Sequence, residues 1–149
     1  MLIFMFSHSA LAENFCFTEA GRAYDISPSL LKAISEVESN GNPHAVNYNR
    51  YSGSTDIGHM QINSFWKKYL GKRYDHLFNA CYCTKVGAWI LQQCIERYGY
   101  EWDAVACYHT GYGISDAKSG LKHKNALRYV HKVKQKLKEL GDARTCLKY

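Results

Sequence analysis

The sequence has few of the features that divide a chain into separate parts. Only two of its 149 residues are proline, Pro28 and Pro43, and it contains neither an internal repeat nor a low-complexity tract. Nothing therefore marks a linker between domains. The length suffices for one domain with its own core and is short for two typical ones. We expect a single folded domain over residues 13–149.

Long hydrophobic runs are also absent. The apolar run at residues 2–6 is far shorter than the roughly 20 residues that a membrane-spanning helix needs. It is followed by Ala10-Leu11-Ala12, a pattern that signal peptidase accepts, although the usual basic residues do not precede it. We interpret residues 1–12 as a signal peptide with a clipped or misassigned start, with a membrane anchor as the alternative. This predicts a periplasmic protein without stable membrane insertion after signal removal.

Motifs for several kinds of chemistry are missing as well. The sequence has no glycine-rich loop of the kind that holds phosphate groups and no array of metal ligands. Only one residue separates Cys81 from Cys83, which is closer than zinc-binding pairs usually are, and no second cysteine pair with zinc-binding spacing follows. A thiol nucleophile is disfavoured too, because Cys107 and His109 would not face each other on a helix. We expect neither a metal nor a cofactor.

The cysteines that are present favour disulfides. An even number of cysteines in a small exported domain is typical of a disulfide framework, so we expect up to three bridges. Spacing leaves the pairing open among the six residues Cys16, Cys81, Cys83, Cys94, Cys107 and Cys146.

Basic residues exceed acidic ones, 19 against 13, which gives a formal net charge of +6. Residues 1–12 contain no Lys, Arg, Asp or Glu, so the mature chain keeps this charge. A basic surface attracts anionic partners. Because the leader indicates export, we expect an acidic polymer outside the cytoplasm and not nucleic acid.

Capping residues and helical periodicity predict a mainly helical fold. Ser27 and Pro28 are typical of a helix start, and residues 40–43 (NGNP) would end that helix near Ser39. Residues 45–63 have little helical periodicity and predict a loop with short extended segments. Further helices are predicted over residues 15–24, 65–70, 80–98, 102–108 and 123–140, the last with a buried stripe at Ala126, Val130, Val133, Leu137 and Leu140.

One carboxylate falls on the apolar side of the helix that begins at Pro28. Leu30, Ile34 and Val37 form that side, and Glu38, four residues after Ile34, lies on or beside it. Burial raises the pKa of a carboxyl group and keeps it protonated near neutral pH, as a general acid requires. Position alone favours the alternative, which is a salt bridge at the helix end.

Three motifs favour catalysis over that alternative. Residues 31–39 (LKAISEVES), followed by 42–46 (NPHAV), resemble the Glu-Ser motif of family 1 lytic transglycosylases. Residues 58–62 (GHMQI) are similar to the Gly-Leu-Met-Gln-Ile block of that family, and residues 106–111 (ACYHTG) to its Ala-x-Tyr-Asn-x-Gly block. All three occur in the family's order. The size, the leader and an early cysteine resemble in particular the small single-domain transglycosylases associated with type III secretion.

Residues 53–64 (GSTDIGHMQINS) are also similar to the Gly-Ser-Thr-Asp-Tyr-Gly-Ile-Leu-Gln-Ile-Asn-Ser block of animal c-type lysozymes. The aspartate of that block is the second catalytic carboxylate, a role that the resemblance carries to Asp56. Most family 1 transglycosylases manage without it, so this sequence combines two patterns. The alternative is that Asp56 only shapes a turn between Thr55 and Gly58.

The two resemblances imply a mainly α, lysozyme-like α+β fold, in which residues 45–63 form one wall of a glycan-binding cleft. Glu38 and Asp56 would be the catalytic residues. The implied substrate-binding residues are Ser39, Met60, Gln61, Tyr108 and His109.

Several of these residues have other interpretations. Gln61 could satisfy backbone groups, and Tyr108 could be a core aromatic residue with a bonded hydroxyl. The sequence also departs from the family at His59, where leucine is usual, and at His109, where asparagine is usual. These departures predict rearranged hydrogen bonds near Tyr108 and an imidazole contribution to the pH profile.

The implied activity is that of a peptidoglycan lytic transglycosylase. Glu38 would protonate the oxygen between N-acetylmuramic acid and N-acetylglucosamine, and the muramic C6 hydroxyl would then close a 1,6-anhydro ring. The alternatives are a hydrolytic muramidase that uses Glu38 and Asp56, and a non-catalytic glycan-binding or secretion-scaffold module. The expected partners are peptidoglycan strands, whose peptide stems carry carboxylates, and a component of a type III secretion apparatus. We expect a monomer.

Overall fold

The helix that carries Glu38 begins and ends where the sequence predicts. In the computed structural model, which describes residues 14–142, helix α2 spans Pro28–Ser39. The Ser27 hydroxyl caps its start by accepting the N–H of Leu30 at 3.4 Å. Asn40, in a left-handed conformation with φ of 57°, ends the helix and bonds its N–H back to the last turn. Both ends are therefore determined by neighbouring residues.

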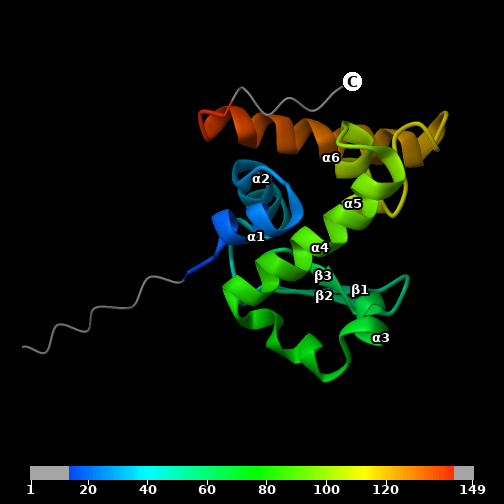
Figure 1. The fold of residues 1–149 in the computed structure, drawn as a ribbon. Helices are drawn as coiled ribbons and strands as arrows, with labels where there is room; N and C mark the ends of the chain where they lie inside the picture. Colours follow the sequence, from blue (N-terminus) through cyan, green and yellow to red (C-terminus); the bar gives the residue numbers. More distant parts are fainter. Residues whose placement is uncertain (1–13, 143–149) are drawn as a thin grey trace, which may run out of the picture.

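Helix α4 (Ala80–Tyr98) runs through the middle of the molecule, as Figure 1 shows. Helix α1 (Phe17–Tyr24) packs on α4 and α2. Helix α5 (Trp102–Thr110) follows α4 and packs against it, and α6 (Gly120–Glu139) contacts both α2 and α5. The end of α2 is thus brought to α5 and α6.

A small antiparallel sheet lies on the opposite side of α4 from α6 (Figure 1). Its strands are β1 (Val46–Asn49), β2 (Ser54–Ile57) and β3 (Ile62–Asn63), in that order. Asp56 on the central strand pairs with Asn47 on one side and with Asn63 on the other. The mainly α, α+β fold with a short β segment is confirmed.

Short helical turns connect the sheet to α4. They are η1 (Ser64–Trp66), α3 (Lys67–Leu70) and η2 (Gly71–Phe78). The helix predicted over 65–70 is therefore partly a 3₁₀ turn. Asn79 caps α4 at the predicted start of that helix, because its side-chain oxygen accepts the N–H of Tyr82 at 2.9 Å.

The core lies between these helices and the sheet, and its fully buried side chains include Leu30, Leu31, Ile34, Met60, Leu91 and Val133. The stripe predicted on the last helix is buried except at its end, where Leu140 is partly exposed. Helix α6 begins at Gly120, three residues earlier than predicted. It also buries Tyr129, which the sequence analysis did not single out.

Two disulfides join the helices. Cys16–Cys81 connects the start of α1 to α4, and Cys94–Cys107 connects α4 to α5. Cys83 is a buried free thiol, and Cys146 lies outside the described residues. Two of the expected bridges are therefore present among residues 14–142. Helix α1 begins later than predicted because Cys16 is left-handed, with φ of 54°.

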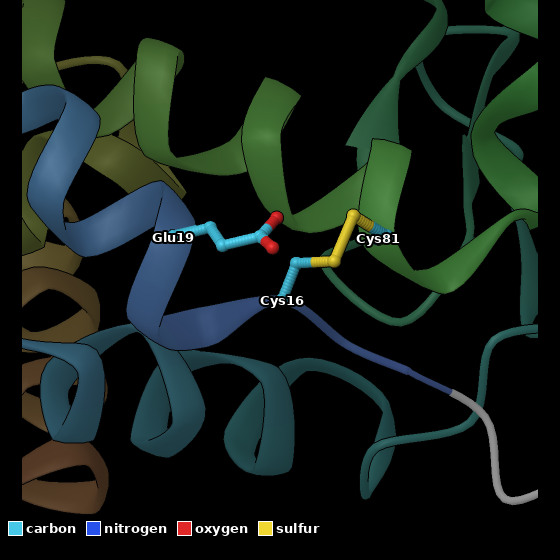
Figure 2. A group of neighbouring side chains, drawn as sticks. All are labelled: Cys16, Glu19 and Cys81. Carbon is cyan, nitrogen blue, oxygen red and sulfur yellow. A yellow bond between two sulfur atoms is a disulfide. The ribbon is translucent and has the colours of Figure 1, made fainter.

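Figure 2 shows Glu19 beside the first disulfide. The side-chain ligand atoms of Cys16, Glu19 and Cys81 lie within 4.8 Å of one another, which is metal-binding distance. The two sulfur atoms are bonded to each other, however, and a disulfide sulfur is not a thiolate ligand. Glu19 forms an ion pair with Lys85 at 3.5 Å. The cluster therefore links α1 to α4 and, while oxidised, offers a metal ion no thiolate.

The predicted signal peptide at residues 1–12 lies outside the described residues. Over residues 14–142, none of the helices has the combination of length and apolar character that crossing a membrane requires.

Gly58 packs closely against α4 and against the turn before it. It has φ of 74°, and a Cβ atom would lie 2.5 Å from the carbonyl oxygen of Leu77 and 2.7 Å from Cys83 Sγ. We expect Gly58→Ala to lower the free energy of unfolding by roughly 3 kcal/mol, through the left-handed backbone and the close contacts together. Urea denaturation measures this loss.

Gly53→Ala is the matched control, because Gly53 has φ of 68° and no atom within 4 Å of an added Cβ. This substitution should cost only about 1 kcal/mol. Equal losses for the two variants would show that the contacts around Gly58 are not the constraint.

Candidate active site

The Glu38 carboxyl lies at the end of α2 and is nearly enclosed, with 11% of its side chain exposed. The hydroxyl of Tyr129, on α6, donates a hydrogen bond to Glu38 Oε1 at 2.7 Å. Burial, and then the nearby Glu38 charge, raises the pKa of Tyr129 well above its usual value. The hydroxyl therefore keeps its proton and remains a donor to the carboxyl.

His109, on α5, approaches the same carboxyl oxygen. Its Nδ1 lies 3.4 Å from Glu38 Oε1, and its ring stacks on Tyr129 with centroids 4.2 Å apart. A protonated His109 forms an ion pair with the carboxylate, whereas a neutral ring contributes no charge. The helix-end alternative considered from the sequence therefore has a titratable partner within reach, and the contact is a salt bridge only when His109 carries a proton.

Asp56, on β2, is held by the two neighbouring strands. The Asn49 side-chain amide donates to Asp56 Oδ2 at 2.8 Å, and the Asn63 amide donates to Oδ1 at 2.6 Å. Among residues 14–142, Asp56 forms no ion pair. Its carboxylate is therefore fixed by neutral donors, and its charge is not neutralised by a neighbouring cation.

Glu38 and Asp56 line one cleft, which has a volume of about 1170 Å³. The predicted residues Gln61, Tyr108 and His109 line it as well. The cleft also contains aromatic surface that the sequence analysis did not use, from Phe65, which is 57% exposed, and from Trp66. Flat aromatic rings of this kind can pack against the apolar faces of sugar rings. A cleft with two carboxyls and such rings can bind and cleave a glycan strand.

Gln61 and Tyr108 shape the wall of the cleft. Gln61 has a left-handed backbone with φ of 49°, and its side-chain amide donates to the carbonyl oxygen of Gly58 at 2.9 Å. The Tyr108 hydroxyl donates to the carbonyl oxygen of Met60 at 2.7 Å. Burial, and then the charge of Glu38, raises the pKa of Tyr108 well above its usual value, so this bond persists. Both residues therefore hold the backbone of residues 58–62 and also face the cleft.

Ser39 and Met60 lie behind this wall and do not line the cleft. The Ser39 hydroxyl donates to the carbonyl oxygen of His59 at 2.8 Å. The Met60 side chain is fully buried against Gly87. The prediction that the Met60 side chain contacts the substrate is therefore wrong, because no part of this side chain reaches the surface. Ser39 is placed to hold the backbone of residues 58–62.

His59 is a fully buried member of the core. Its Nδ1 lies 2.7 Å from the Ser35 hydroxyl, and its Nε2 lies 2.9 Å from the carbonyl oxygen of Ala80 and 3.1 Å from the Thr84 hydroxyl. Burial lowers the pKa of His59, opposed by the bond to Ala80. His59 therefore lies in the core, where it affects stability, whereas His109 is the histidine that lies beside the Glu38 carboxyl.

Sequence reasoning missed the residues that hold the two carboxyls. Tyr129 lies three residues after Ala126 and four before Val133, on the predicted apolar stripe of the last helix. A tyrosine on such a stripe needs a hydrogen-bond partner for its hydroxyl, and this requirement could have identified Tyr129 from the sequence. Asn49 and Asn63 carried no such signal, because asparagine is common in turns.

The chain matches the sequence model of a family described as Transglycosylase SLT domain, over residues 15–130. Invasion protein IagB of Salmonella typhimurium (strain SL1344) is 37% identical over 129 residues, which cover 84% of this chain and 76% of the relative. Protein IpgF of Shigella flexneri is 40% identical over 112 residues, covering 72% of this chain and 73% of the relative. The family match includes all three motifs and both carboxyls.

A third relative covers almost the whole chain. It is named Peptidoglycan-binding-like protein, comes from Escherichia coli O157:H7, and is 31% identical over 157 residues, covering 99% of this chain and 92% of the relative.

The buried His59 predicts how stability depends on pH. Above its ordinary pKa of 6.5, the histidine is neutral in both the folded and the unfolded chain. Below 6.5 the unfolded chain binds the proton first, so the free energy of unfolding falls until the lowered folded pKa is reached. Well below pH 6.5 the loss should be about 1.4 kcal/mol for each pH unit until the folded pKa is approached.

Urea denaturation at a series of pH values checks this for the wild type and for His59→Gln, which should lack most of the loss. His131→Gln is the matched control, because His131 is an exposed histidine on α6. If wild type and His59→Gln lost stability in parallel, another group would have to be responsible.

Proposed function

Because the chain belongs to the transglycosylase SLT domain family, we propose that it is a peptidoglycan lytic transglycosylase. Its substrate is the β-1,4 bond between N-acetylmuramic acid and N-acetylglucosamine. The observation that carries the proposal is the placement of Glu38, which is nearly buried, hydrogen-bonded by Tyr129 and in one cleft with Asp56. A carboxyl in such a site can release and recover a proton, as general acid and base catalysis requires.

Glu38 acts first as the acid. Tyr129 and His109 both approach Oε1, whereas Oε2 has no hydrogen bond or ion pair within residues 14–142. Oε2 is therefore the oxygen that holds the proton to be transferred. Protonation of the glycosidic oxygen breaks its bond to the muramic C1 and releases the N-acetylglucosamine hydroxyl, while positive charge develops at C1.

Asp56 and then the substrate itself complete the reaction. The Asp56 carboxylate stabilises the positive charge at C1, and the Asn49 and Asn63 amides keep it in position. The muramic C6 hydroxyl attacks C1 within the same sugar and returns its proton to Glu38. A 1,6-anhydro ring forms, the enzyme regains its starting state, and no water is consumed.

A hydrolytic muramidase is the second candidate, and Asp56 is the observation that favours it. A carboxylate in the cleft with Glu38 can serve as a nucleophile or as an ion-pair partner while water completes the reaction. The two candidates differ in the end that they leave on the muramic acid, anhydro or reducing.

We further propose that the protein acts in the periplasm. The disulfides Cys16–Cys81 and Cys94–Cys107 support this location, because such bridges form and persist in oxidising compartments. Recruitment by a component of a type III secretion apparatus is a separate proposal, which rests on the resemblance in size, leader and early cysteine. A pull-down from envelope extracts that recovered no apparatus protein would count against it.

Digestion of purified sacculi, followed by mass spectrometry of the soluble products, tests the reaction. We expect predominantly 1,6-anhydro ends, and predominantly reducing ends would make the protein a muramidase. Glu38→Gln should lower the rate by roughly a thousandfold, because the proton donor is lost. Asp56→Asn should lower it by about tenfold to a hundredfold, because the charge at C1 is less well stabilised.

Glu36→Gln is the matched control, since Glu36 lies on the same helix but outside the cleft. It should keep the wild-type rate. A non-catalytic glycan-binding module would behave differently, because its function would survive Glu38→Gln.

Tyr129→Phe tests the donor to Glu38. The change removes one hydroxyl and keeps the ring that stacks on His109. We expect kcat to fall about tenfold, the value of one hydrogen bond to a charged group. The alkaline limb of the kcat/KM profile, along which a general acid loses its proton, should move to higher pH, because loss of a donor to the carboxylate disfavours its ionised form.

Tyr100→Phe is the matched control, because the Tyr100 hydroxyl accepts the Ser27 N–H away from the cleft. A profile that moved equally in both variants would point to a general loss of stability.

A further inference from the structure

A second pocket, about 440 Å³ in volume, opens beside Glu38. It shares Glu38, His109 and Thr110 with the cleft, so a ligand in the cleft can extend into it. Its outer wall comes from α6 and includes Arg128 and Lys132. Asp56 does not line it. The pocket is therefore a chemically different continuation of the same site.

Arg128 and Lys132 give this pocket unpaired positive charge. They are four residues apart on α6 and so lie on one face of the helix, and both are exposed. Neither forms an ion pair or a hydrogen bond within residues 14–142. By contrast, Lys136 pairs with Glu139 on the same helix at 2.6 Å.

The pocket offers these cations no partner of its own. Glu38 is the one acidic residue in its described lining, and its Oε1 is already engaged by Tyr129 and His109. Asn125, three residues before Arg128 on the same face, adds a side-chain amide. An arginine fork, an ammonium group and an amide together suit a carboxylate ligand.

We propose that this pocket binds a carboxylate of the peptide stem on the N-acetylmuramic acid residue that is cleaved at Glu38. The inference rests on the proposed function, because that reaction places a muramic residue beside the pocket. The stem is attached to the same sugar whose C1 reacts, so it must leave the site close to Glu38. The pocket thereby makes the protein selective for glycan strands whose stems carry free carboxylates.

Binding measurements in a Glu38→Gln background test the proposal without turnover. The first ligand is an uncrosslinked glycan fragment with tripeptide stems, and the second is the same fragment with its stem carboxyls converted to amides. Arg128→Gln/Lys132→Gln should weaken binding of the first fragment about tenfold, the loss of roughly 1.4 kcal/mol of charge-assisted contact. The amidated fragment should be affected much less.

Lys124→Gln/Lys138→Gln is the matched control, because it removes the same charge from exposed positions of α6 outside the pocket. It should leave the affinity for both fragments nearly unchanged. The proposal is overturned if the pocket variant weakens both fragments equally, if the control matches it, or if neither fragment binds.

Cleavage of sacculi by the protein with Glu38 intact separates this inference from the proposed function. Cleavage together with equal binding of the two fragments would overturn only the stem-binding pocket. Selective binding of the carboxylate fragment without any cleavage would overturn only the transglycosylase, and the pocket would then belong to a glycan-binding protein.

Discussion

The burial of one carboxyl group at the meeting point of three helices is the constraint on which this site depends. A carboxyl removed from water needs hydrogen-bond donors, because its desolvation otherwise costs several kcal/mol. Glu38 on α2 obtains one from Tyr129 on α6, and His109 on α5 lies within ion-pair distance of the same carboxyl oxygen. The position of α6 across α2 is therefore a condition of the chemistry as well as of the core, and Tyr129 belongs to both.

The opposite wall of the cleft is rigid because it is anchored in the core. Residues 58–62 approach α4 closely at Gly58, bury the side chains of His59 and Met60, and receive the Tyr108 hydroxyl on a backbone carbonyl. Gln61 and Ile62 are the residues of this segment that line the cleft. Such anchoring limits movement of this wall, and the proposed acid catalysis requires a wall that holds its position.

The two ends of the site present charges of opposite sign. On the sheet side, Asp56 is held by neutral amides and keeps an uncompensated negative charge, which suits a cationic transition state. On the α6 side, Arg128 and Lys132 present positive charge without a partner in the described chain, which suits an anionic substituent. These two residues place part of the chain's basic charge close to Glu38.

Local signals in the sequence determined the bounds of α2 and α4 and the placement of Glu38 on a buried helix face, because capping and the 3.6-residue period involve only neighbouring residues. The motifs also indicated the family and the segment that forms the second wall. Only the tertiary structure decided which disulfides form, that Met60 points into the core, and that Tyr129, 91 residues away, bonds Glu38. It likewise separated the two histidines, burying His59 and placing His109 beside the carboxyl. These outcomes depend on how distant segments pack, and residue spacing carries no information about that.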